Sequence, residues 1–351
     1  MPISFERIRR TLKSFKRFHL LFPIIRVLES IYLILKLQWI SYANLRMLNR
    51  TWGHNKLNLI PIQEIHDISI PQTQGIYCYN PTILAKDGKV LGFARTTNVS
   101  YLPTLDYSGS SILRQHVPYL LNGVVSFELD HEFRLTKVSD LRPLERVPNL
   151  EDPKAIVIDG NLNLFCNLVS KEQNGDDRAI HCSNASLMVE NGELTIYKSP
   201  FRKNIEKNWI PFVSGGTTLS FFYSVAPQIL LVLDPNVAEP GVRILDEVSV
   251  ENFHGGSQVV EIVPNLFVRV ARRRIVLPRR KIATLSYMVF HNPEGEIIRM
   301  SKPFLFKKFG FEICNGLTLE GANVLFSWGE DDIRMYVGKI PIQDLLAWAQ
   351  D

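Results

Sequence analysis

The sequence predicts an all-β protein, a five-bladed β-propeller with a basic, amphipathic helical extension at its N-terminus. From residue 75 onward, short apolar segments rich in Val, Ile, Phe and Tyr alternate with Gly, Asp, Asn and Pro turns. Polar motifs recur five times along this part of the chain, and helical periodicity is confined to the N-terminus and to residues 342–349. We therefore assign residues 1–60 to the helical extension and residues 61–351 to the propeller.

The composition is that of a globular protein. The chain has 351 residues, of which 46% are hydrophobic and 21% charged, and this excludes a wholly disordered or collagen-like chain. Propellers often exceed the usual length of one domain. Because the cysteines lie far apart and form no CxxC pair, we expect reduced thiols and neither a disulfide framework nor a metal site. The four cysteines are Cys78, Cys166, Cys182 and Cys314.

Positive charge is concentrated at the N-terminus. Residues 1–50 hold ten Lys/Arg and two Asp/Glu, a net charge of +8, so the other 301 residues sum to −3 within the total of +5. The propeller therefore lacks the basic composition of a nucleic-acid-binding protein, and we expect no nucleic-acid partner.

The segment Leu20–Ile40 is apolar but carries several interruptions, whereas a membrane-spanning helix needs about 20 mostly uncharged residues. On a helix, its charged side chains fall within about a third of the circumference and leave a wide apolar face. The pattern predicts one of two roles. The helix either docks on the protein itself or on a partner, which could be a second copy bound through residues 1–45, or it lies on a membrane surface, preceded by a basic arm. No secretory signal is evident, so the expected location is the cytoplasm, with the inner membrane face as the alternative. The interruptions are Pro23, Arg26, Glu29 and Lys36.

Paired apolar runs separated by short turns predict the hairpins of the propeller in order. Four of the turns contain Asp-Gly, Asn-Gly or Gly-Gly, whose residues tolerate the positive φ that tight turns require, and the last is Pro293-Glu294-Gly295. The pairs are Thr82–Leu84 with Val90–Phe93, Ala155–Ile158 with Leu162–Cys166, Leu187–Val189 with Leu194–Tyr197, Ile210–Phe212 with Leu219–Tyr223, and Ser286–Phe290 with Ile297–Met300. The last strands are expected at Leu317, Val324–Trp328 and Met335–Ile340, ahead of a helix over residues 342–349.

Five polar motifs divide these hairpins into units. The motifs begin at residues 80, 151, 208, 255 and 312, and each is followed by a strand, a turn and another strand. Each unit has room for a four-stranded sheet, which favours a five-bladed propeller. A two-sheet sandwich is the alternative, but it would not explain a polar motif ahead of every unit. In a propeller, polar residues at the entrances of the innermost strands converge on one central pocket.

In this order the motifs resemble the blades of the glycoside hydrolase family 130 group, five-bladed propellers that act on mannosides as inverting phosphorylases or hydrolases. The resemblance covers about residues 75–345. Its motifs are Asn80-Pro81-Thr82-Ile83 with Arg95-Thr96-Thr97-Asn98, Glu151-Asp152-Pro153-Lys154, Glu206-Lys207-Asn208-Trp209 with Tyr223, Gly255-Gly256-Ser257, and Glu312 with Gly316 and Ser327-Trp328-Gly329-Glu330-Asp331-Asp332.

The resemblance assigns proton donation to Asp152. Cleavage of a glycosidic bond needs an acid that protonates the leaving oxygen, and inversion needs a nucleophile on the opposite face. Next to Glu151 in a central funnel, the Asp152 carboxyl is expected to have a raised pKa through like-charge repulsion. The alternative is that Asp152 only caps the entrance of a strand.

The resemblance also implies a set of substrate-binding residues. A phosphorylase needs cations for phosphate, and Arg95, Lys207 and His254 are the candidates. Amide and aromatic side chains suit sugar recognition. Each of these residues could have a structural role instead of binding substrate. The cations could form ion pairs between blades, Trp209 could be a core residue, and Asp332 could only hold the last turn. The remaining candidates are Asn80, Asn98, Glu151, Lys154, Glu206, Asn208, Trp209, Tyr223, Glu312 and Asp332.

Three positions depart from the family pattern. Lys154 stands where the family has Arg, Gln258 stands where it has Pro, and the strand Leu266–Arg274 lacks the usual His. The region from Arg269 to Lys281 carries seven cations, which predict either a modified anion site facing the funnel or a solvated hairpin face.

Three functions are consistent with these residues. The first is an enzyme of the family 130 type that cleaves mannoside-like bonds by phosphorolysis or hydrolysis, with inorganic phosphate as a co-substrate and no cofactor. The second is a glycosyltransferase on the same propeller that uses a nucleotide sugar or sugar phosphate to build a surface glycan. The third is a non-catalytic glycan-binding propeller. In each, the expected partner is an oligosaccharide or polysaccharide.

Overall fold

The predicted all-β, five-bladed propeller is confirmed by a computed structural model of the chain. It describes residues 58–350 except 72–75, 87, 98–121, 141–149, 172–179, 198–199, 202–207, 215–217, 226, 234–239, 247–252 and 277–281. Internal contacts separate residues Met1–Asn55 with Val276–Lys281 from a second unit, Lys56–Ile275 with Ile282–Asp351. The second unit is the propeller. The sequence features predicted for residues 1–45 lie outside the described residues.

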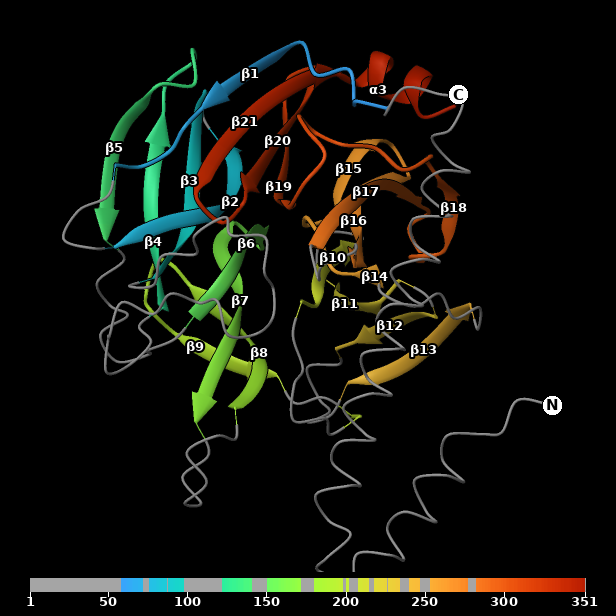
Figure 1. Ribbon diagram of the computed structural model, residues 1–351. Helices are drawn as coiled ribbons and strands as arrows, with labels where there is room; N and C mark the ends of the chain where they lie inside the picture. The colour runs from blue at the N-terminus through green and yellow to red at the C-terminus, as the bar shows by residue number, and fades with distance from the viewer. Residues whose placement is uncertain are drawn as a thin grey trace, which may run out of the picture. The chain divides into compact units, whose positions relative to one another are not determined.

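Five antiparallel sheets follow one another around the propeller (Figure 1). The first blade contains β2 (Tyr77–Lys86), β3 (Lys89–Thr97), β4 (Asn122–Leu129) and β5 (Leu135–Asp140). The second contains β6 (Leu150–Ile158), β7 (Asn161–Lys171), β8 (Ile180–Met188) and β9 (Leu194–Tyr197). The third contains β10 (Ile210–Ser214), β11 (Thr218–Ser224), β12 (Gln228–Val232) and β13 (Gly241–Asp246). The fourth contains β14 (Phe253–His254), β15 (Val260–Val263), β16 (Leu266–Val276), β17 (Ile282–His291) and β18 (Ile297–Met300). The fifth contains β1 (Glu64–Asp67), β19 (Glu312–Glu320), β20 (Asn323–Glu330) and β21 (Arg334–Pro341).

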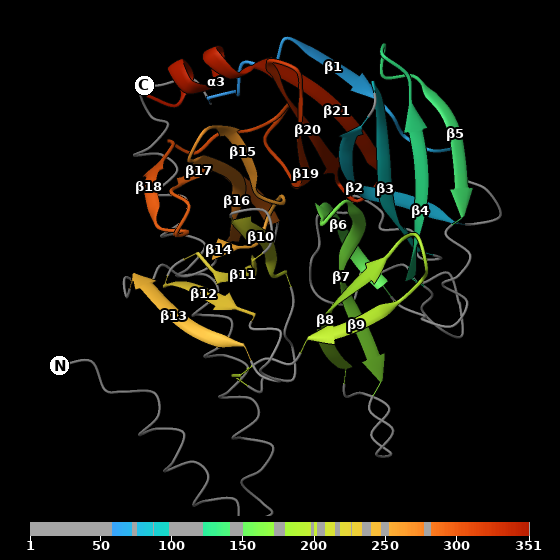
Figure 2. The ribbon, with the colours of Figure 1, turned by 180° about the vertical axis from the view of Figure 1, so that it is seen from behind.

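The first described strand closes the ring. Strand β1 pairs antiparallel with β21 at the outer edge of the fifth blade, with Glu64 opposite Lys339 (Figure 2). The Lys339 ammonium also lies 3.1 Å from the Glu64 carboxylate. The fifth blade is therefore built from both ends of the propeller sequence, and this pairing protects the edge of β21.

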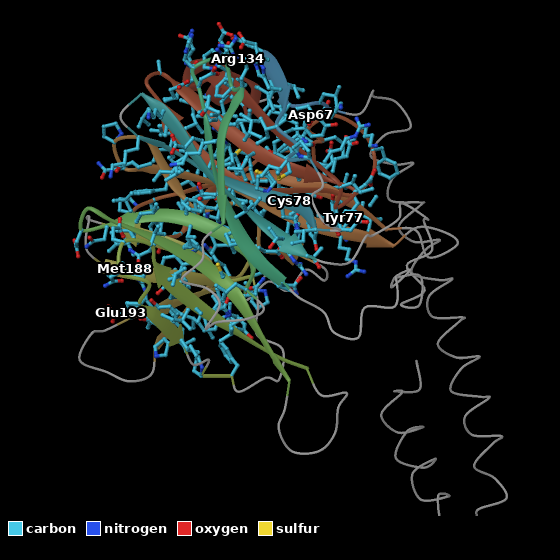
Figure 3. The ribbon with its side chains drawn as sticks, turned by 90° about the vertical axis from the view of Figure 1, so that its left-hand side faces the viewer. Asp67, Tyr77, Cys78, Arg134, Met188 and Glu193 are labelled. Atoms are coloured by element: carbon cyan, nitrogen blue, oxygen red, sulfur yellow. The ribbon has the colours of Figure 1, made fainter. Side chains whose placement is uncertain are left out.

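The hairpins lie where the turn residues predict them. Asp159 and Gly160, between β6 and β7, have φ values of 48° and 80°, the left-handed pair that a two-residue hairpin turn requires. Figure 3 shows Met188 and Glu193 at the hairpin that joins β8 to β9, where the Met188 N–H donates to the Glu193 carbonyl at 2.9 Å. The short helix α3 (Ile342–Trp348) confirms the helix expected at the C-terminal end.

The core is formed between neighbouring blades. One cluster joins Phe93 and Val124 of the first blade to Leu164 of the second, and another joins Ile83 of the first blade to Leu325 of the fifth. These side chains are almost completely buried, and each contributes about 1.5–3 kcal/mol relative to an exposed side chain. Faces of adjacent sheets therefore hold the ring together.

No helix in the part of the chain that the structure describes is long and apolar enough to cross a membrane. Cys166 and Cys314 are buried thiols that form no disulfide with another described residue, whereas the Cys182 side chain lies outside the described residues.

Close backbone contact at the propeller axis predicts an effect of Gly316→Ala. A Cβ on Gly316 of β19 would lie 2.7 Å from the Ile83 nitrogen and 2.9 Å from the Thr82 Cα of β2. We expect a destabilisation of about 1–3 kcal/mol, because these backbone atoms cannot move aside cheaply. Chemical denaturation measures the effect. Gly241→Ala, on the outer strand β13, is the control, since its nearest neighbour would lie at 3.7 Å. Equal stabilities of the two variants would contradict the proposed close packing.

Candidate functional site

A left-handed residue lies within the inner strands β2 and β6, and another lies just ahead of β10. Asn80, Asp152 and Asn208 have φ values of 53°, 51° and 66° in successive blades. Asn and Asp tolerate this conformation better than other non-glycine residues. The strand register shifts at Tyr79/Thr82 and at Glu151/Lys154, so the bends at Asn80 and Asp152 are bulges. Pro follows Asn80 and Asp152, and its missing N–H costs no ladder hydrogen bond at a bulge.

The bends bring side chains of different blades into contact near the axis. The Asn80 amide nitrogen donates to Asp152 Oδ1 at 3.0 Å, and the Asn315 amide nitrogen of β19 donates to the Asn80 carbonyl at 3.4 Å. In the next blades, the Asn208 backbone N–H donates to the Asn167 side chain at 2.7 Å. The polar motifs of the sequence therefore lie at the contacts between inner strands.

A buried ion pair joins the first two blades. The Arg95 guanidinium of β3 donates to Glu151 Oε1 at 2.7 Å and lies 3.6 Å from Asp152 Oδ1. Asn122 accepts from Arg95 at 3.0 Å and donates to the same Glu151 oxygen at 2.9 Å. Arg95 and Glu151 are each 8% exposed. Buried charges are tolerated only when they are paired and hydrogen-bonded, and Asn122 completes this requirement.

The electrostatic surroundings keep Asp152 ionised, contrary to the raised pKa expected from Glu151. Burial is the largest influence on the pKa of Asp152 and raises it. Arg95, the hydrogen bond from Asn80, Lys154 and Arg272 together outweigh burial, so this pKa lies below its ordinary value. The Glu151 carboxylate is bonded to Arg95 and Asn122. Its repulsion of the Asp152 carboxylate therefore does not determine the pKa of Asp152.

Two further groups of this cluster have pKa values near neutrality. Burial lowers the pKa of the Lys154 ammonium to about 8, and Arg272 lowers it further while Asp152 opposes the change. Burial raises the pKa of Asp332 to about 7; Asp152 and Asp331 add to the rise, and Arg95 and Arg272 oppose it. Groups that titrate near the working pH are suited to acid–base chemistry.

The structure therefore brings together most of the site residues predicted for the first two blades. It adds two residues that were not among the predicted site residues, Asn122 and Arg272. The cluster combines side chains from four blades, and we call it the axial cluster. Asn122 was missed because nothing in its sequence context marks it, and Arg272 was named only within the cation run. The axial cluster consists of Asn80, Arg95, Asn122, Glu151, Asp152, Lys154, Arg272 and Asp332.

Two predicted site residues have structural roles instead. Trp209 is 3% exposed and packs against Phe221 and Tyr223 with ring centroids 5.5 Å and 5.8 Å away, so it is a core residue and offers no open ring face to a sugar. Glu312 is 1% exposed, and its carboxylate accepts the backbone N–H groups of residues 306, 307 and 308. It therefore holds that loop, although burial raises its pKa to about 7.

Other predicted positions lie away from the cluster or cannot be placed. Asn208 contacts Asn167, and the half-buried Tyr223 contacts the rings of Trp209 and Phe201. Asn98, Glu206, Lys207 and the His254 side chain lie outside the described residues.

The structure gives a role to Gln258 and places two cations of the strand that lacks the usual His. The Gln258 amide of the fourth blade donates to the Ile83 carbonyl of the first blade at 3.1 Å and lies 3.4 Å from Thr82 Oγ1, so it links two blades. Arg269 is buried away from solvent, where its Nε donates to His291 at 2.9 Å and its guanidinium lies 4.4 Å from the centre of the Phe222 ring. Within the run of cations, Arg272 influences the pKa of Asp152, Lys154 and Asp332.

The described residues contain no group of three or more His, Cys, Asp and Glu side chains arranged to hold a metal ion. The axial cluster instead pairs carboxylates with three cationic side chains, Arg95, Lys154 and Arg272. Such an arrangement can hold an anion or a polyhydroxylated ligand and exchange a proton with it.

Comparison with solved structures supports the same fold. No protein-family model matches the sequence, and no curated protein matches it. A glycosyl hydrolase from Bacteroides ovatus is 11% identical, with a TM-score of 0.57 over 82% of this chain and 97% of that chain. A mannose phosphorylase from Leishmania mexicana, in complex with phosphate ion, is 13% identical, with a TM-score of 0.55 over 86% and 94%. A GDP-Man-dependent mannosyltransferase from the same organism is 12% identical, with a TM-score of 0.54 over 86% and 93%. The chain thus has the propeller fold of these proteins, as the resemblance implied.

The raised pKa of Asp332 predicts a pH-dependent effect of Asp332→Asn on stability. A carboxyl whose pKa is higher in the folded than in the unfolded protein stabilises the fold fully below its unfolded value of about 4. This contribution is lost as the pH rises through the folded value of about 7. Asp332→Asn should therefore be more stable than the wild type at pH 8, by about 2 °C or more, and its stability should change less between pH 4 and pH 7.

Thermal unfolding measured from pH 4 to pH 9 tests this expectation. Asp331→Asn is the matched control, because Asp331 lies on the same turn but its carboxylate pairs with Lys308 at 3.1 Å. Wild-type and Asp332→Asn curves that run parallel over this range would show that Asp332 has no raised pKa.

Proposed function

We propose that the protein is a carbohydrate-active enzyme that cleaves mannoside-like glycosidic bonds with inversion, by phosphorolysis or hydrolysis. The observation that carries this proposal is the axial cluster, in which the Asp152 and Asp332 carboxyls lie among the cations Arg95, Lys154 and Arg272. The fold shared with a mannose phosphorylase and a glycosyl hydrolase supports the choice of sugar chemistry.

The residues of the cluster meet the chemical requirements of such a reaction. The leaving oxygen must receive a proton, and the attacking oxygen must reach the opposite face of the sugar ring. Asp152, to which the resemblance assigns proton donation, and Asp332 are the carboxyls that can serve acid–base roles. Arg95 is held rigidly by Glu151 and Asn122, so it presents its charge in a fixed position.

The cations suit an anionic co-substrate. Lys154 is only 3% exposed, and the one hydrogen bond its ammonium makes to the described residues is to the Asp152 carbonyl at 3.4 Å. Its pKa of about 8 leaves it mostly protonated at pH 7, and a bound phosphate would raise that pKa further. Lys154 thus supplies a point charge in place of the Arg of the family pattern, with less directional bonding than a guanidinium.

A glycosyltransferase is the second candidate function. Arg272 comes from a strand rich in cations, and it extends the positive charge of the cluster beyond Arg95 and Lys154. A nucleotide sugar or sugar phosphate carries the anionic groups that such a cluster would hold. The shared fold of a GDP-Man-dependent mannosyltransferase supports this alternative.

Turnover assays separate these functions. The purified full chain is incubated with β-1,2-mannobiose with and without inorganic phosphate, with mannose 1-phosphate and an acceptor mannose, and with GDP-mannose and the same acceptor. We expect release of mannose 1-phosphate only with phosphate, or of mannose alone with water. Transfer from GDP-mannose alone would establish the transferase, and sugar binding without turnover would indicate a binding protein and contradict both enzymatic functions.

The role of the cations in the reaction is tested by Arg272→Met. We expect the KM for the anionic co-substrate to rise about tenfold or more, because one charge-assisted contact is lost. Arg274→Met is the matched control, since Arg274 lies on the same strand but is exposed. Equal KM values for the two variants would exclude Arg272 from the anion site.

A further inference from the structure

The two aspartates of the axial cluster, Asp152 and Asp332, differ in their hydrogen bonds. Asp152 Oδ1 accepts the Asn80 amide at 3.0 Å and lies 3.6 Å from the Arg95 guanidinium. Both contacts stabilise a carboxylate, which only accepts hydrogen bonds. Asp332 Oδ1 is buried and has no hydrogen-bond partner among the described residues. A buried carboxylate oxygen without a donor is costly, and protonation lowers that cost because it removes the charge.

The turn that carries Asp332 explains this difference. Asp331 and Asp332 both have left-handed backbone, with φ values of 54° and 52°, in the hairpin between β20 and β21. The nearby cation Lys308 is used by its neighbours, at 2.9 Å from Glu330 and 3.1 Å from Asp331. Asp332 therefore lies among Arg95, Asp152, Arg272 and Asp331 without a direct donor for its buried oxygen.

We propose that Asp332 on the fifth blade, and not Asp152, holds the proton that the leaving oxygen receives, while Asp152 remains a carboxylate and acts as the base or as an electrostatic partner of the sugar. This proposal rests on the proposed function, and it divides the acid and base roles between two blades. The pKa of about 7 for Asp332 and the lowered pKa of Asp152 agree with this division.

The step balances in atoms and charge. The bond between the anomeric carbon and the leaving oxygen breaks, and its electron pair goes to that oxygen, which takes the proton from Asp332. The attacking oxygen forms the new bond on the opposite face. In phosphorolysis this oxygen belongs to hydrogen phosphate and the product is the sugar 1-phosphate. In hydrolysis it belongs to water, whose released proton passes to the Asp152 carboxylate.

Leaving-group dependence tests which residue donates the proton. A residue that protonates the leaving oxygen is dispensable when the leaving group departs as a stable anion. We expect Asp332→Asn to lose about 100-fold to 10,000-fold in kcat on β-1,2-mannobiose and to retain at least a tenth of wild-type kcat on 2,4-dinitrophenyl β-mannoside. Asp152→Asn should lose turnover of both substrates. The opposite pattern, with only Asp152→Asn recovered by the dinitrophenyl substrate, would overturn the proposal.

A direct titration does not depend on turnover. Carbon-13 labelling of aspartate side chains follows each aspartate carboxyl by NMR without the Glu312 signal, and we expect one aspartate of the wild type to titrate near pH 7. That titration should vanish in Asp332→Asn and persist in Asp152→Asn, with Asp331→Asn as the control on the same turn. If it persists in Asp332→Asn, or if no carboxyl titrates near pH 7, the assignment of the proton to Asp332 is wrong.

The two measurements separate the inference from the function it rests on. If the wild type cleaves neither substrate, the proposed function fails, and the titration alone decides whether Asp332 is protonated. If the wild type is active but the rescue pattern is reversed, the function stands and Asp152 is the donor. Thermal unfolding of each variant identifies any loss of activity that comes from misfolding.

Discussion

The bends in the inner strands determine what this propeller can do. A regular strand would send alternate side chains into the mostly apolar interfaces between blades, where a polar group needs a hydrogen-bond partner. At Asn80 and Asp152 a left-handed residue shifts the strand register, and the two side chains bond to each other between adjacent blades. The buried pair of Arg95 and Glu151 then becomes tolerable, because it is bonded within a polar network and not surrounded by apolar side chains. The chemistry of the cluster depends on this placement.

Most of the fold could be predicted from the sequence, because hairpins and blades are encoded locally. The Asp-Gly turn at Asp159 and the recurring polar motifs each specify a local backbone conformation, and their order along the chain sets the five blades. The pairing of β1 with β21 was not predicted, since Glu64 and Lys339 are 275 positions apart and no local pattern marks them as partners. Long-range pairing depends on the closed ring and not on a short motif.

The site was less predictable than the fold, because it depends on contacts between blades. The family-like motifs located Arg95 and Asp152, but the protonation of Asp152 reverses the expectation, since it is set by cations from other blades. A tryptophan is a common sugar-binding side chain, yet Trp209 lies in the core because it packs against Phe221 and Tyr223. The sequence alone does not show that these three rings are in contact. Asn122 carries no motif at all, and only the hydrogen bonds that join it to Arg95 and Glu151 reveal its role.

The central claim is that the axial cluster is a single site that holds both a sugar and an anion. The most direct test is a crystal structure of the full chain with mannose and inorganic phosphate bound. The account predicts that the sugar lies within hydrogen-bond distance of Asp332 and Asp152, and that phosphate contacts at least two of the three cations Arg95, Lys154 and Arg272. A well-ordered sugar and phosphate bound elsewhere on the propeller, with the axial cluster closed to both, would contradict it.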